Sequence, residues 1–216
     1  MKKQASKLWR ENKTFLVFIT LMLVFRSAVA DWNEVPTGSM KPTIVEGDRV
    51  LVNKLAYDIQ IPFIGVSVWK VADPRRGDIV VFDSEAADIR LVKRVIGIPG
   101  DSVQLKNNIL IINDYELVYQ NVLASGFDID KVEDLFGVKH KIRTHHLGSP
   151  LSNFDKITVP EDHYFVLGDN RDNSSDSRVI GLVPREEFVG KVKQVVLSLD
   201  YENFFIPRKD RFFLTL

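Results

Sequence analysis

The chain has 216 residues, with 29 basic and 29 acidic side chains and no cysteine. The absence of cysteine excludes disulfides, zinc–thiolate sites and cysteine nucleophiles, and the balanced charge gives no reason to expect a nucleic-acid partner. Six basic residues and one acidic residue precede residue 31, a net charge of +5, so residues 31–216 carry −5. The length predicts one domain with an appendage, or two small domains.

An apolar run, Phe15–Phe25, is broken only by Thr20 and follows a basic segment. Positive charge before such a run keeps that end in the cytoplasm and places the rest of the chain outside. The residues alone leave two interpretations open. A secretory signal would be cut after the small-x-small motif Ala28–Ala30. An anchor would extend over residues 15–30, which reach about 24 Å as a helix.

From Val35 onward, short apolar runs rich in Val, Ile, Phe and Tyr alternate with Gly, Pro, Asn and Asp, as β-structure prefers. We expect a mostly β body of coiled antiparallel sheets that form a partly closed, barrel-like fold. The expected strands are Arg49–Lys54, Asp78–Asp83, Arg90–Ile98, Ser102–Lys106, Ile109–Ile112, Glu116–Val118, Lys139–His145, Asp155–Val159, Tyr164–Leu167 and Phe188–Ser198.

Two local features interrupt these strands. Asn107 and Asn108 predict a tight hairpin turn, because asparagine tolerates positive φ. The segment Asp128–Phe136 predicts one short helix. Residues 117–156 are more polar and irregular than the rest, and we expect an insertion or a small subdomain there.

A serine lies in the stiff segment Pro36–Thr43, next to Gly38 and between two prolines. Proline fixes φ, and glycine lets a backbone approach a ligand closely. An exposed Ser39 hydroxyl beside backbone N–H groups suits acyl transfer, although a serine in such a turn is usually only a turn residue.

A lysine lies in the expected strand Arg90–Ile98. Alternate residues of a strand share a face, so Lys93 lies with Leu91 and Val95, whereas Arg94 points to the other side. Burial on an apolar face lowers a lysine pKa, and a neutral amine can take a serine proton. The plainer interpretation is an edge lysine that reaches water.

Two further segments accompany this pair. Gly168–Arg178 is a dense polar loop that can support a site with hydrogen bonds and ion pairs. Its alternatives are a simple turn or a calcium loop, and two arginines among the possible ligands weigh against calcium. Gly47–Lys54 predicts a turn and a core strand.

Taken in their order along the chain, and preceded by an apolar helix, these four segments resemble the conserved boxes of bacterial type I signal peptidases. The resemblance extends in pieces from about Phe15 to Lys191. It implies a serine endopeptidase without metal or organic cofactor, and it favours the anchor over the cleaved signal. The expected organisation is a cytoplasmic tail (1–14), a single transmembrane anchor (15–30) and an extracytoplasmic catalytic body (31–216) on the bacterial cytoplasmic membrane.

The resemblance also assigns roles. It implies Ser39 as nucleophile and Lys93 as general base, with Ser174 orienting the lysine. The residues expected to support the site are Thr37, whose hydroxyl joins the Ser39 N–H in the oxyanion hole, Met40 in the substrate-binding wall, and the ion pair of Asp176 with Arg178.

The implied partners are preprotein signal peptides, cut after small residues and bound along a strand edge, and the phospholipid bilayer. We expect a monomer. Two alternatives stay open at this stage: a specialised pilus or conjugation maturation protease of the same family, and a secreted, non-catalytic β-rich binding module released after Ala30. The apolar anchor and the lack of a recognisable DNA-binding domain argue against a self-cleaving repressor-like protease.

Overall fold

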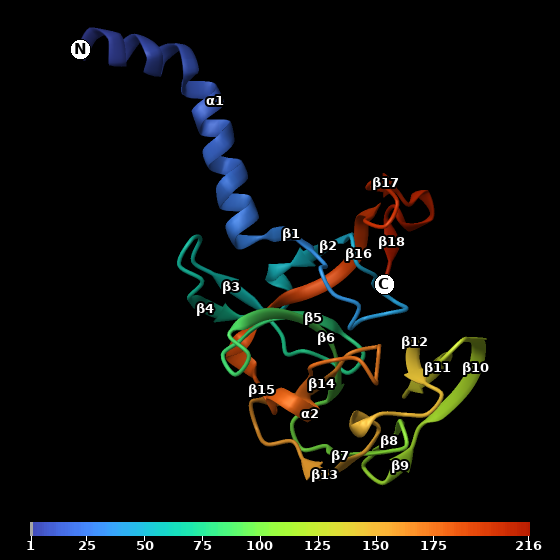
Figure 1. Cartoon of the computed structure of the whole chain (residues 1–216). Coiled ribbons are helices and arrows are strands. Elements are labelled where there is room, and N and C mark those ends of the chain that lie inside the picture. Colours follow the sequence, from blue (N-terminus) through green and yellow to red (C-terminus); the bar gives the residue numbers. More distant parts are fainter. Residues whose placement is uncertain (1) are drawn as a thin grey trace.

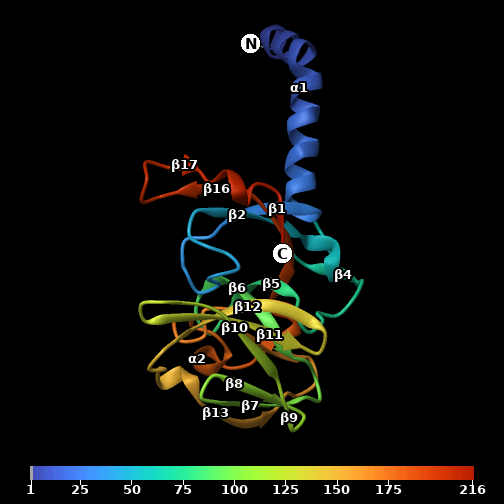
Figure 2. The ribbon, with the colours of Figure 1, turned by 90° about the vertical axis from the view of Figure 1, so that its right-hand side faces the viewer.

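Helix α1 (Lys2–Ala28) projects from a body made mostly of β-strands (Figures 1 and 2). The computed structural model describes residues 2–216, with side chains from residue 12 onward. The helix ends two residues before the expected end of the 15–30 segment, because Ala30 begins strand β1 and pairs with Asn53. Within the described residues we find no helix that combines the length and the apolarity needed to span a bilayer. The membrane anchor therefore stays a prediction.

The largest sheet contains β6, the strand that carries Lys93. Its strand order is β1-β2-β16-β5-β6-β14-β15, and β17 and β18 also pair with β16. The bounds are β1 Ala30–Glu34, β2 Asp48–Asn53, β5 Ile79–Ser84, β6 Ile89–Gly97, β14 His163–Leu167, β15 Val183–Pro184, β16 Phe188–Asp200, β17 Ile206–Pro207 and β18 Leu214–Thr215.

Three smaller sheets complete the body, with orders β13-β7-β8-β9, β10-β11-β12 and β3-β4. Their bounds are β3 Asp58–Gln60, β4 Ser67–Lys70, β7 Ser102–Lys106, β8 Ile109–Ile112, β9 Tyr115–Glu116, β10 Val118–Ser125, β11 Asp128–Leu135, β12 Val138–His145 and β13 Phe154–Thr158. All pairings between named strands are antiparallel. A short helix, α2 (Ser177–Ile180), follows the polar loop.

The mostly β, antiparallel prediction is confirmed, but the barrel-like closure is not, because the main strand order runs as an open path from β1 to β15. The hairpin turn is confirmed: Asn107 and Asn108 have φ values of 49° and 61° between paired strands β7 and β8.

The predicted helix over Asp128–Phe136 is wrong. These residues form β11, which is paired on both sides by β10 and β12. Its buried residues Glu133 and Leu135 alternate with partly exposed neighbours, which is the two-residue period of a strand. Residues 117–156 hold this three-stranded sheet, and their status as a separate subdomain stays a prediction.

Two apolar clusters hold the strands that carry the site. One joins β2, β5 and β16 to Met40 and Ile44 of the segment after β1. The other joins β5, β6 and β14 around Phe188. Val92 of β6 packs against the first cluster and Val95 of β6 lies in the second, so core packing on both sides sets the position of β6 relative to the segment around residue 39.

Candidate active site

Ser39 lies in a turn whose neighbouring residue is anchored in the core. Met40 is 0 % exposed and packs in the cluster with Val35 and Ile44. Ser39 itself is half-buried. A Cβ on Gly38 would lie 2.6 Å from Oε1 of Glu46, so a larger residue here would have to displace the end of that side chain. Burial of Val35, Met40 and Ile44 therefore fixes the turn to the core, while Ser39 lines a hollow at the surface.

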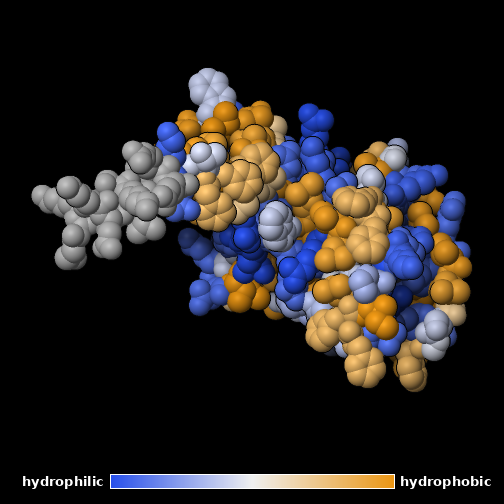
Figure 3. Space-filling model, turned by 90° about the horizontal axis from the view of Figure 1, so that it is seen from above, coloured by the Kyte–Doolittle hydropathy of each residue, from blue (hydrophilic) through white to orange (hydrophobic). Residues whose placement is uncertain are grey.

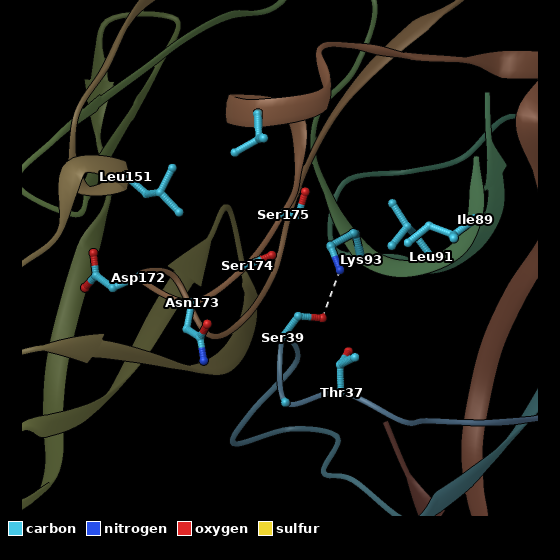
Figure 4. A pocket seen from close by; sticks show the side chains of 12 residues that line it. Thr37, Ser39, Ile89, Leu91, Lys93, Leu151, Asp172, Asn173, Ser174 and Ser175 are labelled. Carbon is cyan, nitrogen blue, oxygen red and sulfur yellow. Dashed lines mark hydrogen bonds between the residues drawn. The ribbon is translucent and has the colours of Figure 1, made fainter. Parts of the chain in front are cut away.

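Lys93 lies on β6 and reaches this serine. Its Nζ donates a hydrogen bond of 2.9 Å to Ser39 Oγ (Figure 4). It donates a second bond, of 3.0 Å, to the Val92 carbonyl. The lysine is only 2 % exposed. Burial lowers its pKa from 10.5 to about 8, although the nearby carboxylates of Asp176 and Asp169 oppose this shift. A neutral amine is therefore accessible close to neutral pH.

The strand phase separates Lys93 from its neighbour Arg94. Leu91 and Ile89 line the same hollow as Lys93. Arg94 instead forms a two-bond ion pair with Asp169, with distances of 2.8 and 2.7 Å. The alternation deduced from the sequence therefore agrees with the contacts of these side chains.

Ser174 does not make the predicted contact with Lys93. Its Oγ is buried and has no hydrogen-bond partner among the described residues, and the two bonds of the amine go to Ser39 and Val92. Ser174 does line the same hollow (Figure 4). Gly168 permits this crowding, since a Cβ there would overlap Ser174 Oγ and approach the Ser39 carbonyl oxygen to 2.5 Å. The orienting role of Ser174 stays a prediction.

Asp176 and Arg178 form the expected ion pair, with bonds of 2.8 and 2.7 Å between side chains that are almost fully buried. Asp176 also accepts from the Gly168 N–H at 3.0 Å and caps α2. Arg178 donates to the Leu151 carbonyl at 2.6 Å. The pair therefore ties the polar loop to the segment before β13.

Two hollows of about 510 and 470 Å³ meet at the serine and the lysine. They share Thr37, Ser39, Ile89, Leu91 and Lys93. The first continues along the polar loop. The second is more apolar, and its further lining includes Trp32, Val35, Met40 and Val92. Thr37 is exposed on the wall of both, and Met40 forms part of the second despite its burial.

Sequence reasoning assigned no role to Asn170 or to Glu133. Asn170 stands in the polar loop and bonds to the segment of the serine, and Glu133 forms a fully buried ion pair with Arg171 of that loop. The dense polar composition of the loop was the only signal for such partners. The described residues contain no cluster of three or more His, Cys, Asp or Glu side chains able to hold a metal ion.

Comparison with known proteins gives the site a family. Residues 8–197 match the family described as "Signal peptidase, peptidase S26". Proteins named "Signal peptidase I" from Pseudomonas aeruginosa and Rickettsia prowazekii are 36% and 35% identical to this chain. The alignments cover 87% and 88% of this chain, and 72% and 80% of those proteins. The chain belongs to this family. It is a serine endopeptidase of the signal peptidase I type, so the non-catalytic binding module is not retained.

A solved signal peptidase I from Enterococcus faecalis is 30% identical to the peptidase described here. The alignment covers 56% of this chain and 98% of that one, with a TM-score of 0.37. A score this low supports no comparison of the two folds.

Proposed function

We propose that this chain is a membrane-bound endopeptidase that removes N-terminal signal peptides from exported preproteins, cutting after small residues. The observation that carries the proposal is the 2.9 Å hydrogen bond between a buried lysine of lowered pKa and a serine at the meeting point of two hollows. A nucleophile with its base in hydrogen-bond reach is the arrangement that covalent catalysis requires.

In the proposed reaction, Ser39 Oγ attacks the scissile carbonyl carbon while neutral Lys93 takes the hydroxyl proton. The amine then gives this proton to the leaving nitrogen as the C–N bond breaks, which leaves an acyl ester on Ser39. Water attacks the ester, Lys93 accepts a proton from it, and the proton returns to Ser39 as the ester bond breaks. The Ser39 N–H and the Thr37 hydroxyl would stabilise the oxyanion of both tetrahedral intermediates.

The edge of β6 supports an extended substrate. On one side β6 pairs with β5 over Ile89–Arg94, but on the other it pairs with β14 only from Arg94 onward. Within the described residues, no strand pairs with 89–93 on that second side, where the one backbone group already bonded to a side chain is the Val92 carbonyl, which accepts from Lys93 Nζ. A peptide added here would gain main-chain hydrogen bonds, and the apolar wall with Val35 and Met40 would take its small side chains.

The end of the body at α1 supports a membrane location. Exposed apolar side chains lie on α1 and between β3 and β4, and Phe63 N–H donates to Ser27 Oγ at the base of the helix. Figure 3, which views this end, shows hydrophobic residues gathered there. We propose a single-pass anchor in the bacterial cytoplasmic membrane, with the N-terminus in the cytoplasm and the catalytic body outside.

The test uses the purified full chain in detergent and a preprotein with a small-x-small site. Mass spectrometry of the product should find a cut directly after that motif. Ser39→Ala and Lys93→Ala should abolish cleavage, whereas the matched exposed controls Ser125→Ala and Lys139→Ala should not. Full activity of Lys93→Ala contradicts the proposed base, and cleavage of only one of many preproteins favours the specialised protease.

A further inference from the structure

The peptide group between Gly38 and Ser39 is held by a residue far away in the chain. Asn170 Nδ2 donates to the Gly38 carbonyl at 3.0 Å, and the Asn170 backbone N–H donates to the Ser39 carbonyl at 3.0 Å. The Gly38 carbonyl also accepts from the Lys41 N–H at 3.1 Å. Two successive carbonyl groups of the nucleophile turn are therefore fixed by one asparagine.

The hydrogen bonds from Asn170 determine the direction of the Ser39 N–H. In a planar trans peptide the C=O of one residue and the N–H of the next point in opposite directions. Since the Gly38 carbonyl faces Asn170, the Ser39 N–H faces away from it. This N–H donates no hydrogen bond within the described part of the chain. It is free to receive an oxyanion beside the Ser39 hydroxyl.

The Asn170 side chain is itself buried, with 5 % exposure. The Gly38 carbonyl can only accept, so the amide nitrogen has to face it. The other amide atom, Oδ1, is buried without a hydrogen-bond partner among the described residues. Among the described residues, the bond to Gly38 is thus the one hydrogen bond of this side chain, and a buried amide is rarely left so sparsely bonded.

Ion pairs on either side hold the loop that presents Asn170. Asp169 is paired with Arg94 of β6, the strand that carries Lys93. Arg171 is paired with Glu133 of β11 by bonds of 2.8 and 2.6 Å, and both side chains are 0 % exposed. The loop backbone also bonds to β12 on both sides of Asn170. The position of Asn170 is therefore fixed on one side relative to β6, which carries Lys93, and on the other side relative to the three-stranded sheet.

We propose that Asn170 is a positioning residue, which aligns the Ser39 N–H for the oxyanion by holding the Gly38 and Ser39 carbonyl groups. The inference rests on the proposed Ser39 mechanism. It also gives the three-stranded sheet β10–β12 a part in the reaction, because Glu133 anchors the loop from that sheet.

The first experiment is steady-state cleavage of a small-x-small peptide by Asn170→Ala. Removing an oxyanion-hole donor outright lowers kcat about 100- to 1,000-fold in serine proteases. Here the donor remains but loses its alignment, so we expect a loss of about 10- to 100-fold in kcat, with KM within about twofold of the unmodified chain. The control is Asn153→Ala, which removes one side-chain bond to the Asn107 N–H elsewhere and should leave kcat unchanged.

The second experiment separates positioning from substrate binding and from folding. In the Ser39→Ala background, the dissociation constant of the uncleaved peptide should be the same with and without Asn170→Ala. Asn170→Asp keeps the side-chain shape but, when ionised, has no donor, so it should lose kcat like the alanine variant. Each variant is compared with the unmodified chain by thermal melting, and the Asp variant replaces the Ala variant if the latter is unfolded.

Three outcomes overturn the inference: an unchanged kcat in both variants, a loss that resides in KM and in the dissociation constant, or an equal loss in Asn153→Ala. A different result would overturn the proposed function instead, namely that the unmodified chain itself fails to cut the peptide.

Discussion

Replacing Lys93 by methionine should abolish cleavage and at the same time stabilise the folded protein at pH 7. The methionine side chain has a similar length and no charge, so the variant removes the base from the proposed mechanism. It also removes a protonated amine that the native state keeps at 2 % exposure. The two effects have one cause, which is the burial that lowers the pKa of Lys93 to about 8.

The magnitude follows from that pKa. The gap between the ordinary value of 10.5 and about 8 corresponds to about 3 kcal/mol, at about 1.4 kcal/mol per pH unit. Below about pH 8 the amine is protonated in both states and the native state bears this full cost. Subtracting about 1 kcal/mol for the lost hydrogen bond to Ser39, we expect Lys93→Met to be more stable by about 2 kcal/mol at pH 7.

The direction in which the stability difference between the two proteins changes with pH is a sharper test than its size. Between about pH 8 and 10.5 the unfolded chain binds a proton that the native state does not, so the stability of the unmodified protein rises with pH. The advantage of Lys93→Met should shrink through this window. Urea unfolding in detergent at several pH values, followed by tryptophan fluorescence, measures both quantities, with the exposed Lys139→Met as control.

The reasoning is refuted if Lys93→Met is less stable than the unmodified protein at pH 7 with no change in the difference up to pH 10.5. Such a result would mean that the native state does not disfavour the ammonium of Lys93. The geometry at Ser39 would then have to activate the serine without a neutral amine.

Three further outcomes are expected. First, kcat/KM should rise about tenfold per pH unit below about pH 8 and level off above it, because only neutral Lys93 accepts the proton; a flat profile from pH 6 to 9 in a cleavage assay would contradict this. Second, Gly168→Ala should lower kcat/KM by at least about 100-fold while the chain stays folded, because its Cβ overlaps Ser174 Oγ; activity within twofold would exclude the crowding. Third, Glu133→Ala should lower the free energy of unfolding by about 3 to 5 kcal/mol, because it leaves Arg171 buried and unpaired; urea unfolding checks this against Glu116→Ala, an exposed control.

Much of the local structure was determined by the sequence. Tight turns and single strands depend on neighbouring residues, so Asn107-Asn108 specified its hairpin and the alternation around Lys93 specified its face. The ordered motifs that resemble signal peptidases identified the serine endopeptidase family before any contact was known.

The tertiary structure decided what depends on residues far apart in the chain. Residues 128–136 were expected as a helix, and pairing with strands on both sides made them β11. The pairing of Lys93 with Ser39, 54 positions away, was expected only from the family resemblance, and the expected contact of Ser174 with the amine is not made. Likewise Asn170 reaches Gly38 across 132 positions. A pattern in one segment carries no information on which distant backbone group will satisfy a buried side chain, because packing of the whole body makes that choice.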